Sequence, residues 1–329
     1  MRSRFFNWLK LAAKFGFAIG VLWYMVATGK LDLEVVKKGF AHTQFILSSV
    51  GLVMLAIVLS LFRWRLLLEG QGISLTSFQL VRYGMIGAFF NTTMPGAVSG
   101  DLIKAWYLIA DRKGQKKTPV LTSILLDRVI GVFGLVMVSA SPILLFGSSV
   151  WAVPQLRTIA IPVLGLFAGV VVFFSYIMLS VWGPLAYLRK RMEGLNENRF
   201  GRVFLQAYDA WTSYRSRPWT LVLALLLSIV NHLCMVLVIF MASRAIGDEP
   251  LSMFHYFLLV PIGLLTTAVP VAPAGLGVGH AAFDALFNLV GSPHGPEMFT
   301  MLVTVQILLN LTGIFFYLRS PKLGPQTGT

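Results

Sequence analysis

The chain has 329 residues, of which 57% are hydrophobic and only 12% are charged, and its mean hydropathy is +0.77. Soluble proteins carry about 25% charged residues, so this composition excludes a water-soluble fold for most of the chain. The formal charge of +14 lies in short loops between apolar runs. That distribution follows the positive-inside rule and excludes nucleic acid as the expected partner. We therefore expect an all-α polytopic integral membrane protein.

Six apolar segments are long enough to cross a bilayer, which takes about 20 residues each. They are residues 8–27, 44–62, 119–147, 158–182, 219–241 and 299–318. Basic residues precede and enter the first segment, and no clean small-residue cleavage site follows it, which predicts a retained signal anchor. The single cysteine, Cys234, lies inside an apolar run, so we expect no disulfide framework and no cysteine-based zinc site.

Two further apolar regions, 77–110 and 254–290, are each long enough for two segments and are broken in the middle by proline and glycine. With the N-terminus inside, 20 basic residues fall on the cytoplasmic side, Arg63, Arg65 and Arg82 among them, and 5 fall outside. This bias predicts that both termini are cytoplasmic. The broken regions then enter from opposite faces. We expect two re-entrant helical hairpins, and two pairs of tilted full spans are the alternative.

The order of segments predicts an inverted repeat within a single transmembrane domain that covers residues 1–329. Its halves are approximately 44–147 and 219–319, and each places a broken region between two full spans. Interrupted helices in inverted repeats are typical of transporters, although proline kinks in ordinary helices would also explain the breaks. In the connector 183–218, apolar and aromatic residues recur at helical spacing and arginines flank them, which predicts a cytoplasmic amphipathic helix anchored on the anionic inner leaflet.

Polar residues gather at the first break and on the return arm of the first hairpin. Polar groups inside a membrane are costly, so each is a candidate site residue. The candidates are Asn91, Pro95, Gly96, Gly100, Asp101 and Lys104. The backbone N–H groups at the start of the return arm, together with Lys104, would suit a phosphate. The alternative is that Asp101 only caps its helix and pairs with Lys104 at i+3.

Asp127 and Arg128 lie about nine residues inside the third full span. Adjacent residues on a helix do not face each other, so each needs its own partner. We expect Asp127 to meet Lys104 or Arg82, and Arg128 to meet Asp101 or a lipid phosphate. Structural ion pairing is the alternative to a role in substrate binding.

The second break supplies candidates of another kind: Pro273, Gly275, Gly277, His280 and Asp284. His280 and Asp284 are one helical turn apart, and we expect them at the place that Asp101 and Lys104 hold in the first hairpin. A histidine can titrate near neutral pH, which leaves a proton-coupled step open. Four polar residues in the flanking spans suit hydrogen bonds between helices: Asn231, His232, Gln306 and Asn310.

In combination these motifs resemble the flippase-like transmembrane domain of lysylphosphatidylglycerol synthases and its stand-alone relatives. The resemblance spans about residues 9–318 and is carried by Asn91…Pro95-Gly96…Gly100-Asp101…Lys104, by Asp127-Arg128…Gly131 and by Pro270…Pro273…Gly275-Leu276-Gly277. It implies an all-helical inverted repeat and lipid translocation between leaflets. Here Ser99 replaces the first glycine of the usual Gly-Gly-Asp, Lys104 replaces an arginine, and His280 replaces a glutamate. The sequence holds no aminoacyl-transfer domain, so we do not expect it to make lysyl-lipid.

We therefore expect a cell-membrane flippase for a phospholipid or a lipid-linked precursor, and not an enzyme. The alternatives are a membrane-embedded transferase acting on a lipid-linked donor and a non-transporting scaffold. No Walker loop and no clustered metal ligands are present in the sequence, so we expect no cofactor and no metal. The identity of the lipid, the driving force and the oligomeric state, including a homo-oligomer, stay open.

Overall fold

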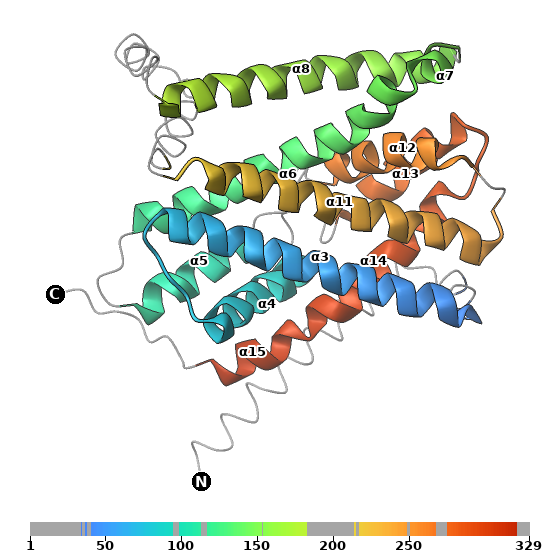
Figure 1. Cartoon of the computed structure of the whole chain (residues 1–329). Coiled ribbons are helices and arrows are strands. Elements are labelled where there is room, and N and C mark those ends of the chain that lie inside the picture. The colour runs from blue at the N-terminus through green and yellow to red at the C-terminus, as the bar shows by residue number, and fades with distance from the viewer. Residues whose placement is uncertain are drawn as a thin grey trace.

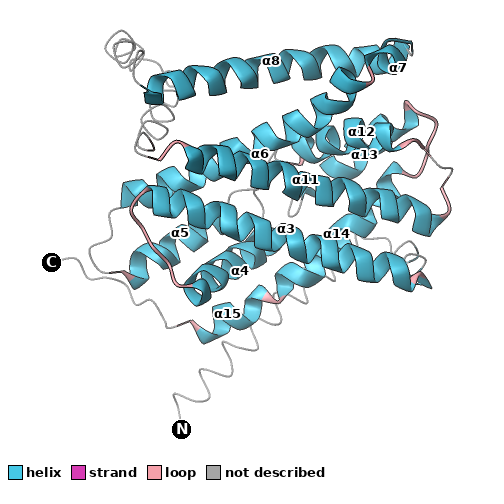
Figure 2. Ribbon diagram, viewed as in Figure 1, coloured by secondary structure: helices cyan, strands magenta, loops and turns pink. Residues whose placement is uncertain are grey.

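The computed structural model describes residues 34, 37, 41–94, 99–112, 117–152, 154–182, 214, 217–248, 251–267 and 275–320. Over these ranges every regular element is a helix and no strand occurs, as Figure 1 and Figure 2 show. The predicted all-α fold is therefore confirmed.

Within the described residues, five helical segments are long and apolar enough to cross a membrane. They are α3 (Thr43–Gly70), α6 (Lys117–Leu145), α8 (Pro154–Trp182), α11 (Trp219–Ile246) and α14 (Gly295–Leu311) continued by α15 (Gly313–Arg319). Each matches one predicted full span, because a bilayer needs about 20 residues at 1.5 Å per residue. The predicted first span, 8–27, lies outside the described residues. The chain is thus a polytopic membrane protein.

Helix α3 continues to Gly70, well past the predicted end of its span at residue 62. The basic residues Arg63 and Arg65 gave the sequence pattern of a loop, but Leu67 and Leu68 behind them are fully buried and keep the segment helical. Arg63 therefore lies in the protein interior and not in a cytoplasmic loop, which corrects the sequence-based placement. Arg82 likewise lies within a helix.

Both broken regions form pairs of short helices. The first pair is α4 (Ser77–Thr93) and α5 (Ser99–Asp111), and the second is α12 (Met253–Thr266) and α13 (Val278–Asn288). These helices have 17, 13, 14 and 11 residues, fewer than the roughly 20 that a full span needs. This length disfavours the alternative of four further full spans. In Figure 1 the two pairs lie toward opposite ends of the bundle.

The packing interlocks the two predicted halves. Helices α3 and α11 run antiparallel, since Ser228 near the start of α11 meets Arg63, and Asn231 meets Ala56 earlier in α3. Helix α4 packs on α14 and α15, and α12 packs in the corresponding way on α6. Hydrogen bonds fasten both contacts: Asn310 donates to the Thr92 hydroxyl over 3.1 Å, and Ser139 donates to the Leu258 carbonyl over 2.9 Å. Such matched pairing is what an inverted repeat requires, and the repeat itself stays a prediction.

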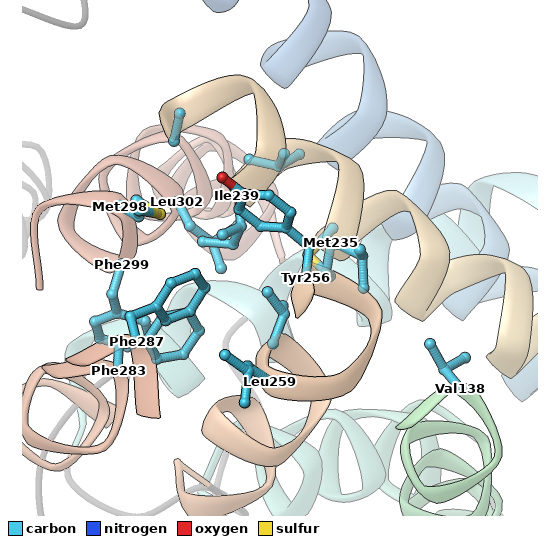
Figure 3. Close-up of a cluster of buried hydrophobic side chains, with 14 of the residues drawn as sticks. Val138, Met235, Ile239, Tyr256, Leu259, Phe283, Phe287, Met298, Phe299 and Leu302 are labelled. Atoms are coloured by element: carbon cyan, nitrogen blue, oxygen red, sulfur yellow. The ribbon is translucent and has the colours of Figure 1, made fainter. Parts of the chain in front are cut away.

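Aromatic side chains fill the core of the second half (Figure 3). The rings of Phe283 and Phe287 stack 5.7 Å apart with an interplanar angle of 12°, and the Phe299 ring lies 5.0 Å from Phe283. Glycines in these helices allow the rings to pack closely against the backbone. A Cβ on Gly279 would lie 2.1 Å from the Phe299 ring, and one on Gly263 would lie 2.4 Å from the Phe283 ring. Helices α12, α13 and α14 therefore pack through rings and glycines.

The short helix α7 (Gly147–Ala152) leads into α8, which packs against α6 along one side of the bundle (Figure 1). Most of the predicted amphipathic connector, 183–218, lies outside the described residues. Its Tyr214 is fully buried and donates a hydrogen bond of 2.5 Å to the Leu67 carbonyl. Burial raises the pKa of the Tyr214 phenol above its usual range, so the phenol stays neutral and keeps donating. The end of the connector is thus fastened to α3.

Candidate functional site

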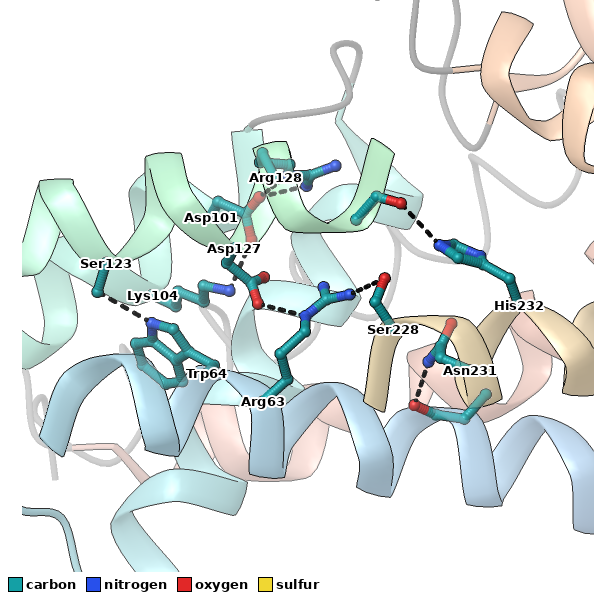
Figure 4. A network of polar contacts seen from close by, with 12 residues as sticks. Arg63, Trp64, Asp101, Lys104, Ser123, Asp127, Arg128, Ser228, Asn231 and His232 are labelled. Carbon is teal, nitrogen blue, oxygen red and sulfur yellow. Dashed lines mark hydrogen bonds and ion pairs between the residues drawn. The ribbon is translucent and has the colours of Figure 1, made fainter. Parts of the chain in front are cut away.

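Five charged side chains from three helices form a network inside the first half of the molecule (Figure 4). Helix α3 contributes one arginine, α5 contributes an aspartate and a lysine, and α6 contributes an aspartate and an arginine. They are Arg63, Asp101, Lys104, Asp127 and Arg128. Buried charges are stable only when they are paired and hydrogen-bonded, so the whole arrangement must form together.

Asp101 lies at the centre of the first part of this network. Its carboxylate accepts a bond of 2.8 Å from the Lys104 ammonium and pairs with the Arg128 guanidinium through its other oxygen. The predicted Arg128–Asp101 contact is therefore confirmed, and so is the pairing of Asp101 with Lys104 at i+3. Only 6% of the Asp101 side chain is exposed. The carboxylate therefore binds two cations and is largely shielded from solvent.

Close contact between the end of α4 and the start of α5 fixes where Asp101 lies. The Gly100 N–H donates to the Asn91 side-chain oxygen over 2.8 Å, which ties the start of α5 to the end of α4. A Cβ on Gly100 would come within 1.9 Å of the Gly87 carbonyl oxygen, so only glycine allows the two helices to approach so closely. Asn91 and Gly100 are thus positioning residues for Asp101. Pro95 and Gly96 lie outside the described residues.

Asp127 has a partner that the sequence did not predict. It accepts a 2.7 Å bond from Arg63, and the same guanidinium donates to the Ser228 hydroxyl over 3.0 Å. The predicted partners, Lys104 and Arg82, were wrong. Lys104 turns to Asp101, while Arg82 and the Tyr83 hydroxyl both bind Asp111 at the base of the hairpin. Because Ser228 belongs to α11, the Arg63–Asp127 pair joins both halves of the protein.

Trp64 completes the network from α3. Its ring lies 4.7 Å from the Lys104 ammonium, a cation–π distance, and its indole N–H donates to Ser123 over 3.3 Å. Sequence reasoning missed Arg63, Trp64, Ser123 and Ser228. One signal for the first two was available, because the leucines of 66–68 continue the apolar pattern beyond Arg63 and imply that this arginine lies within the span.

The second hairpin does not repeat this arrangement. Gly275 and Gly277 take positive φ angles of 70° and 85°, which glycine tolerates, and they shape the turn into α13. His280 bonds Thr300 of α14 over 3.0 Å, whereas Asp284 is exposed and contacts Asn288. The two residues therefore have separate partners and do not form a counterpart of Asp101 and Lys104. Pro273 lies outside the described residues.

The four polar residues in the flanking spans bond neighbouring helices, as predicted. Asn231 donates to the Ala56 carbonyl over 2.7 Å, His232 lies 2.9 Å from the Gly131 carbonyl, and Gln306 reaches the Met235 sulfur at 3.2 Å. Asn310 supplies the bond to Thr92. These contacts hold helices together and do not build a site.

Exposure separates the three cations of the charged network. The side chains of Arg63 and Lys104 are each 10% exposed, while that of Arg128 is 41% exposed. Arg128 follows the first residue of α6, Lys117, by 11 positions, which is about 17 Å along the helix. A charged group within a membrane-spanning helix is expensive unless it is paired or faces a polar passage or a ligand. No cluster of three or more metal-binding side chains occurs in the part of the chain that the structure describes.

These observations define a class: an all-helical, polytopic membrane protein with a largely buried charged network in its first half. The chain belongs to the family described as the lysylphosphatidylglycerol synthase TM region, whose family model matches residues 11–312. The resemblance read from the motifs is therefore confirmed, and it connects the protein with membrane lipids. No curated protein and no solved structure matches the chain.

Proposed function

We propose that this protein is a flippase that moves a phosphate-bearing lipid, or a lipid-linked precursor, between the leaflets of the cell membrane. The observation that carries the proposal is the partly exposed Arg128 beside buried Asp101 and Lys104, inside a helix long and apolar enough to span the membrane. Such a group lowers the cost of bringing a phosphate into the membrane, because arginine pairs well with phosphate oxygens.

The arrangement of the short helices supports transport. Two pairs of short helices lie toward opposite ends of the bundle, as re-entrant hairpins of an inverted repeat would. The orientation follows from the loop charges, with both termini cytoplasmic. Removing the buried Arg63 from the cytoplasmic set leaves the direction of that bias unchanged.

The test is a reconstituted assay with head-labelled lipids in liposomes. We expect leaflet transfer of anionic phospholipid above the protein-free rate, and loss of that excess in the double variant Lys104→Ala, Arg128→Ala. Correct folding of the variant is verified by its elution profile in size-exclusion chromatography and by its circular dichroism spectrum. The proposal fails if wild type and variant both transfer every tested anionic lipid at the liposome background rate.

The ion pairing of the two buried carboxylates favours transport over the transferase alternative. Asp101 and Asp127 are both held by cations, and a carboxylate so held is a weak general base. Lipid mass spectrometry on a deletion strain separates the two. An unchanged lipid inventory with altered sidedness supports the flippase, whereas a missing lipid species supports the transferase. A scaffold would tolerate replacement of Asp101, Lys104 and Arg128 without any change in lipids.

A further inference from the structure

The bonds of Arg63 join three helices at one place (Figure 4). Its guanidinium donates to Asp127 of α6 over 2.7 Å and to Ser228 of α11 over 3.0 Å. We call these three side chains the polar junction, and all three are buried. An ion pair is held strongly only where water is kept away from it, so the residues that shield the polar junction from water matter for its behaviour.

Tyr214 fills the space beside the polar junction. Its side chain is fully buried, and it belongs to one hydrophobic cluster with side chains of the same three helices, among them Leu67, Leu126, Leu221 and Ala224. Its ring lies against the last residue of α3, Gly70, where a Cβ would come within 2.1 Å of the ring. A glycine at this end of α3 therefore allows the ring to enter between the helices.

The ring lies on one side of the polar junction. Leu67 follows Arg63 by about one helical turn, and Ala224 precedes Ser228 by about one turn, so both place the tyrosine toward the connector. The topology predicted from the loop charges assigns this side to the cytoplasm. Burial raises the pKa of the phenol most, and the negative charge of Asp127 raises it further, so the phenol lies within electrostatic reach of the polar junction.

The hydroxyl group fixes the ring in this place. The last carbonyls of a helix have no partner within the helix. At the end of α3 the Gln71 N–H donates to the Leu68 carbonyl, and the Leu67 carbonyl accepts the Tyr214 hydroxyl over 2.5 Å. Because Leu67 is fully buried, removal of the hydroxyl would leave a buried acceptor that entering water would have to satisfy.

From these observations we infer that Tyr214 is a gate residue. It closes the polar junction to the cytoplasm in this conformation, and water reaches the junction from that side when the ring leaves Gly70. The inference goes beyond the proposed function, because it concerns access to the polar junction and not the molecule that is transported. Failure of the flippase proposal would therefore leave it standing.

The experiment measures how fast a thiol at the polar junction reacts with a membrane-impermeant reagent. Ser228→Cys is introduced into the full-length protein together with Cys234→Ala, which removes the single native cysteine. An anionic methanethiosulfonate is added to inside-out vesicles, which expose the cytoplasmic face, or to spheroplasts, which expose the other face. Ser77→Cys, at the exposed start of α4, makes the same change and gives the rate for an open position.

With Tyr214 in place, we expect Ser228→Cys to react far more slowly than Ser77→Cys from the cytoplasmic face. Tyr214→Phe keeps the ring and loses one hydrogen bond, so it should raise the rate about fivefold, from that face only. Tyr256→Phe is the matched control. It removes the hydroxyl of a tyrosine that is equally buried and donates to Ser243 over 2.7 Å in the second half, and it should leave the rate unchanged.

Gly70→Ala gives a second route that leaves every tyrosine in place. Its Cβ would overlap the Tyr214 ring and push it from α3, while alanine favours the helix over glycine, so we expect the same rise in rate. Gly51→Ala, whose Cβ meets nothing within 4 Å, is its control. Equal rates in the parent, Tyr214→Phe and Gly70→Ala proteins would overturn the inference. A rise seen only from the other face, or a parent rate equal to that of Ser77→Cys, would overturn it as well.

Discussion

The two short helix pairs hold corresponding positions in the two predicted halves, but different kinds of side chain pack in them. In the first pair, α5 carries Asp101 and Lys104, which pair with each other and with Arg128 of α6 (Figure 4). The second pair, α12 and α13, surrounds stacked rings of Phe283 and Phe287 (Figure 3). Two similar helix pairs therefore contain different kinds of side chain: charged residues in the first pair and aromatic residues in the second.

This difference separates two kinds of stabilisation. Aromatic packing stabilises through contact area and tolerates little change of shape. Buried ion pairs add little net stability, and they become strongly destabilising when one partner is removed. A five-residue charged network is therefore better explained by a function than by stability, whereas the aromatic packing of the second pair stabilises the bundle.

The largest expected effect comes from breaking the network at Asp127. Asp127→Ala leaves the buried Arg63 without its carboxylate, and we expect a loss of about 3–5 kcal/mol in the free energy of unfolding. Thermal and denaturant unfolding in detergent, followed by tryptophan fluorescence, measure it. The double variant Arg63→Met, Asp127→Leu should recover most of the stability, because an apolar pair leaves no unpaired charge.

The matched control for Asp127 is Glu69→Ala at the exposed pair with Arg65, which should cost less than about 1 kcal/mol. Equal losses for Asp127→Ala and Glu69→Ala would show that the Arg63–Asp127 pair is not buried as described.

Truncation of an aromatic side chain in the second half should lower the free energy of unfolding without changing transport. Phe283 is fully buried between Phe287 and Phe299, so Phe283→Ala leaves a cavity and should cost about 3 kcal/mol. Transport per folded molecule should stay near wild type. Phe315→Ala, on a side chain 57% exposed, serves as control and should change little. Loss of specific transport in a still-folded Phe283→Ala protein would contradict the division of roles between the halves.

Glycine substitutions compare the two halves at corresponding positions. On Gly100 a Cβ would come within 1.9 Å of a backbone carbonyl, so Gly100→Ala must push α5 from α4 and displace Asp101. On Gly279 it would come within 2.1 Å of the Phe299 ring. Overpacking costs about 1–3 kcal/mol at either site. We expect Gly100→Ala to lose lipid binding as well as stability, and Gly279→Ala to lose stability only.

Lipid binding by native mass spectrometry and unfolding in detergent measure both variants. The control is Gly51→Ala in α3, where the added Cβ meets nothing within 4 Å and should be neutral or slightly stabilising. If Gly100→Ala bound lipid as wild type does, the close approach of α4 and α5 would have no part in positioning Asp101.

Much of the fold could be predicted because hydropathy depends on local sequence. The spans of α6, α8 and α11 were predicted within a few residues, apart from the C-terminal end of α11, and both broken regions formed helix pairs. The error at α3 has a physical cause. A window that averages hydropathy treats Arg63 as the start of a loop, although a single buried partner makes it compatible with a helix interior.

The site was predicted less completely because pairing is a long-range property. Asp101, Lys104 and Arg128 were correctly brought together, since i+3 spacing and facing helices limited the choices. The Asp127–Arg63 bond joins residues that are 64 positions apart in the sequence. The Arg63–Ser228 bond joins residues that are 165 positions apart. Nothing in local sequence distinguishes such a serine from many others in apolar spans.

The smallest expected effect concerns His280, which sequence analysis left open as a proton carrier. Its Nδ1 accepts the Gly277 N–H over 3.3 Å, and its Nε2 lies 3.0 Å from the Thr300 hydroxyl. Nδ1 can accept only when it carries no proton, so this geometry uses the neutral imidazole.

His280→Gln should cost about 1 kcal/mol in stability. The pH profile of transport between about pH 6 and 8 should match that of wild type. His294→Gln, on a side chain 45% exposed, controls for the removal of a histidine. A wild-type pH dependence that disappears only in His280→Gln would instead give the aromatic half a chemical part in transport, and the contrast between a charged half and a structural half would have to be given up.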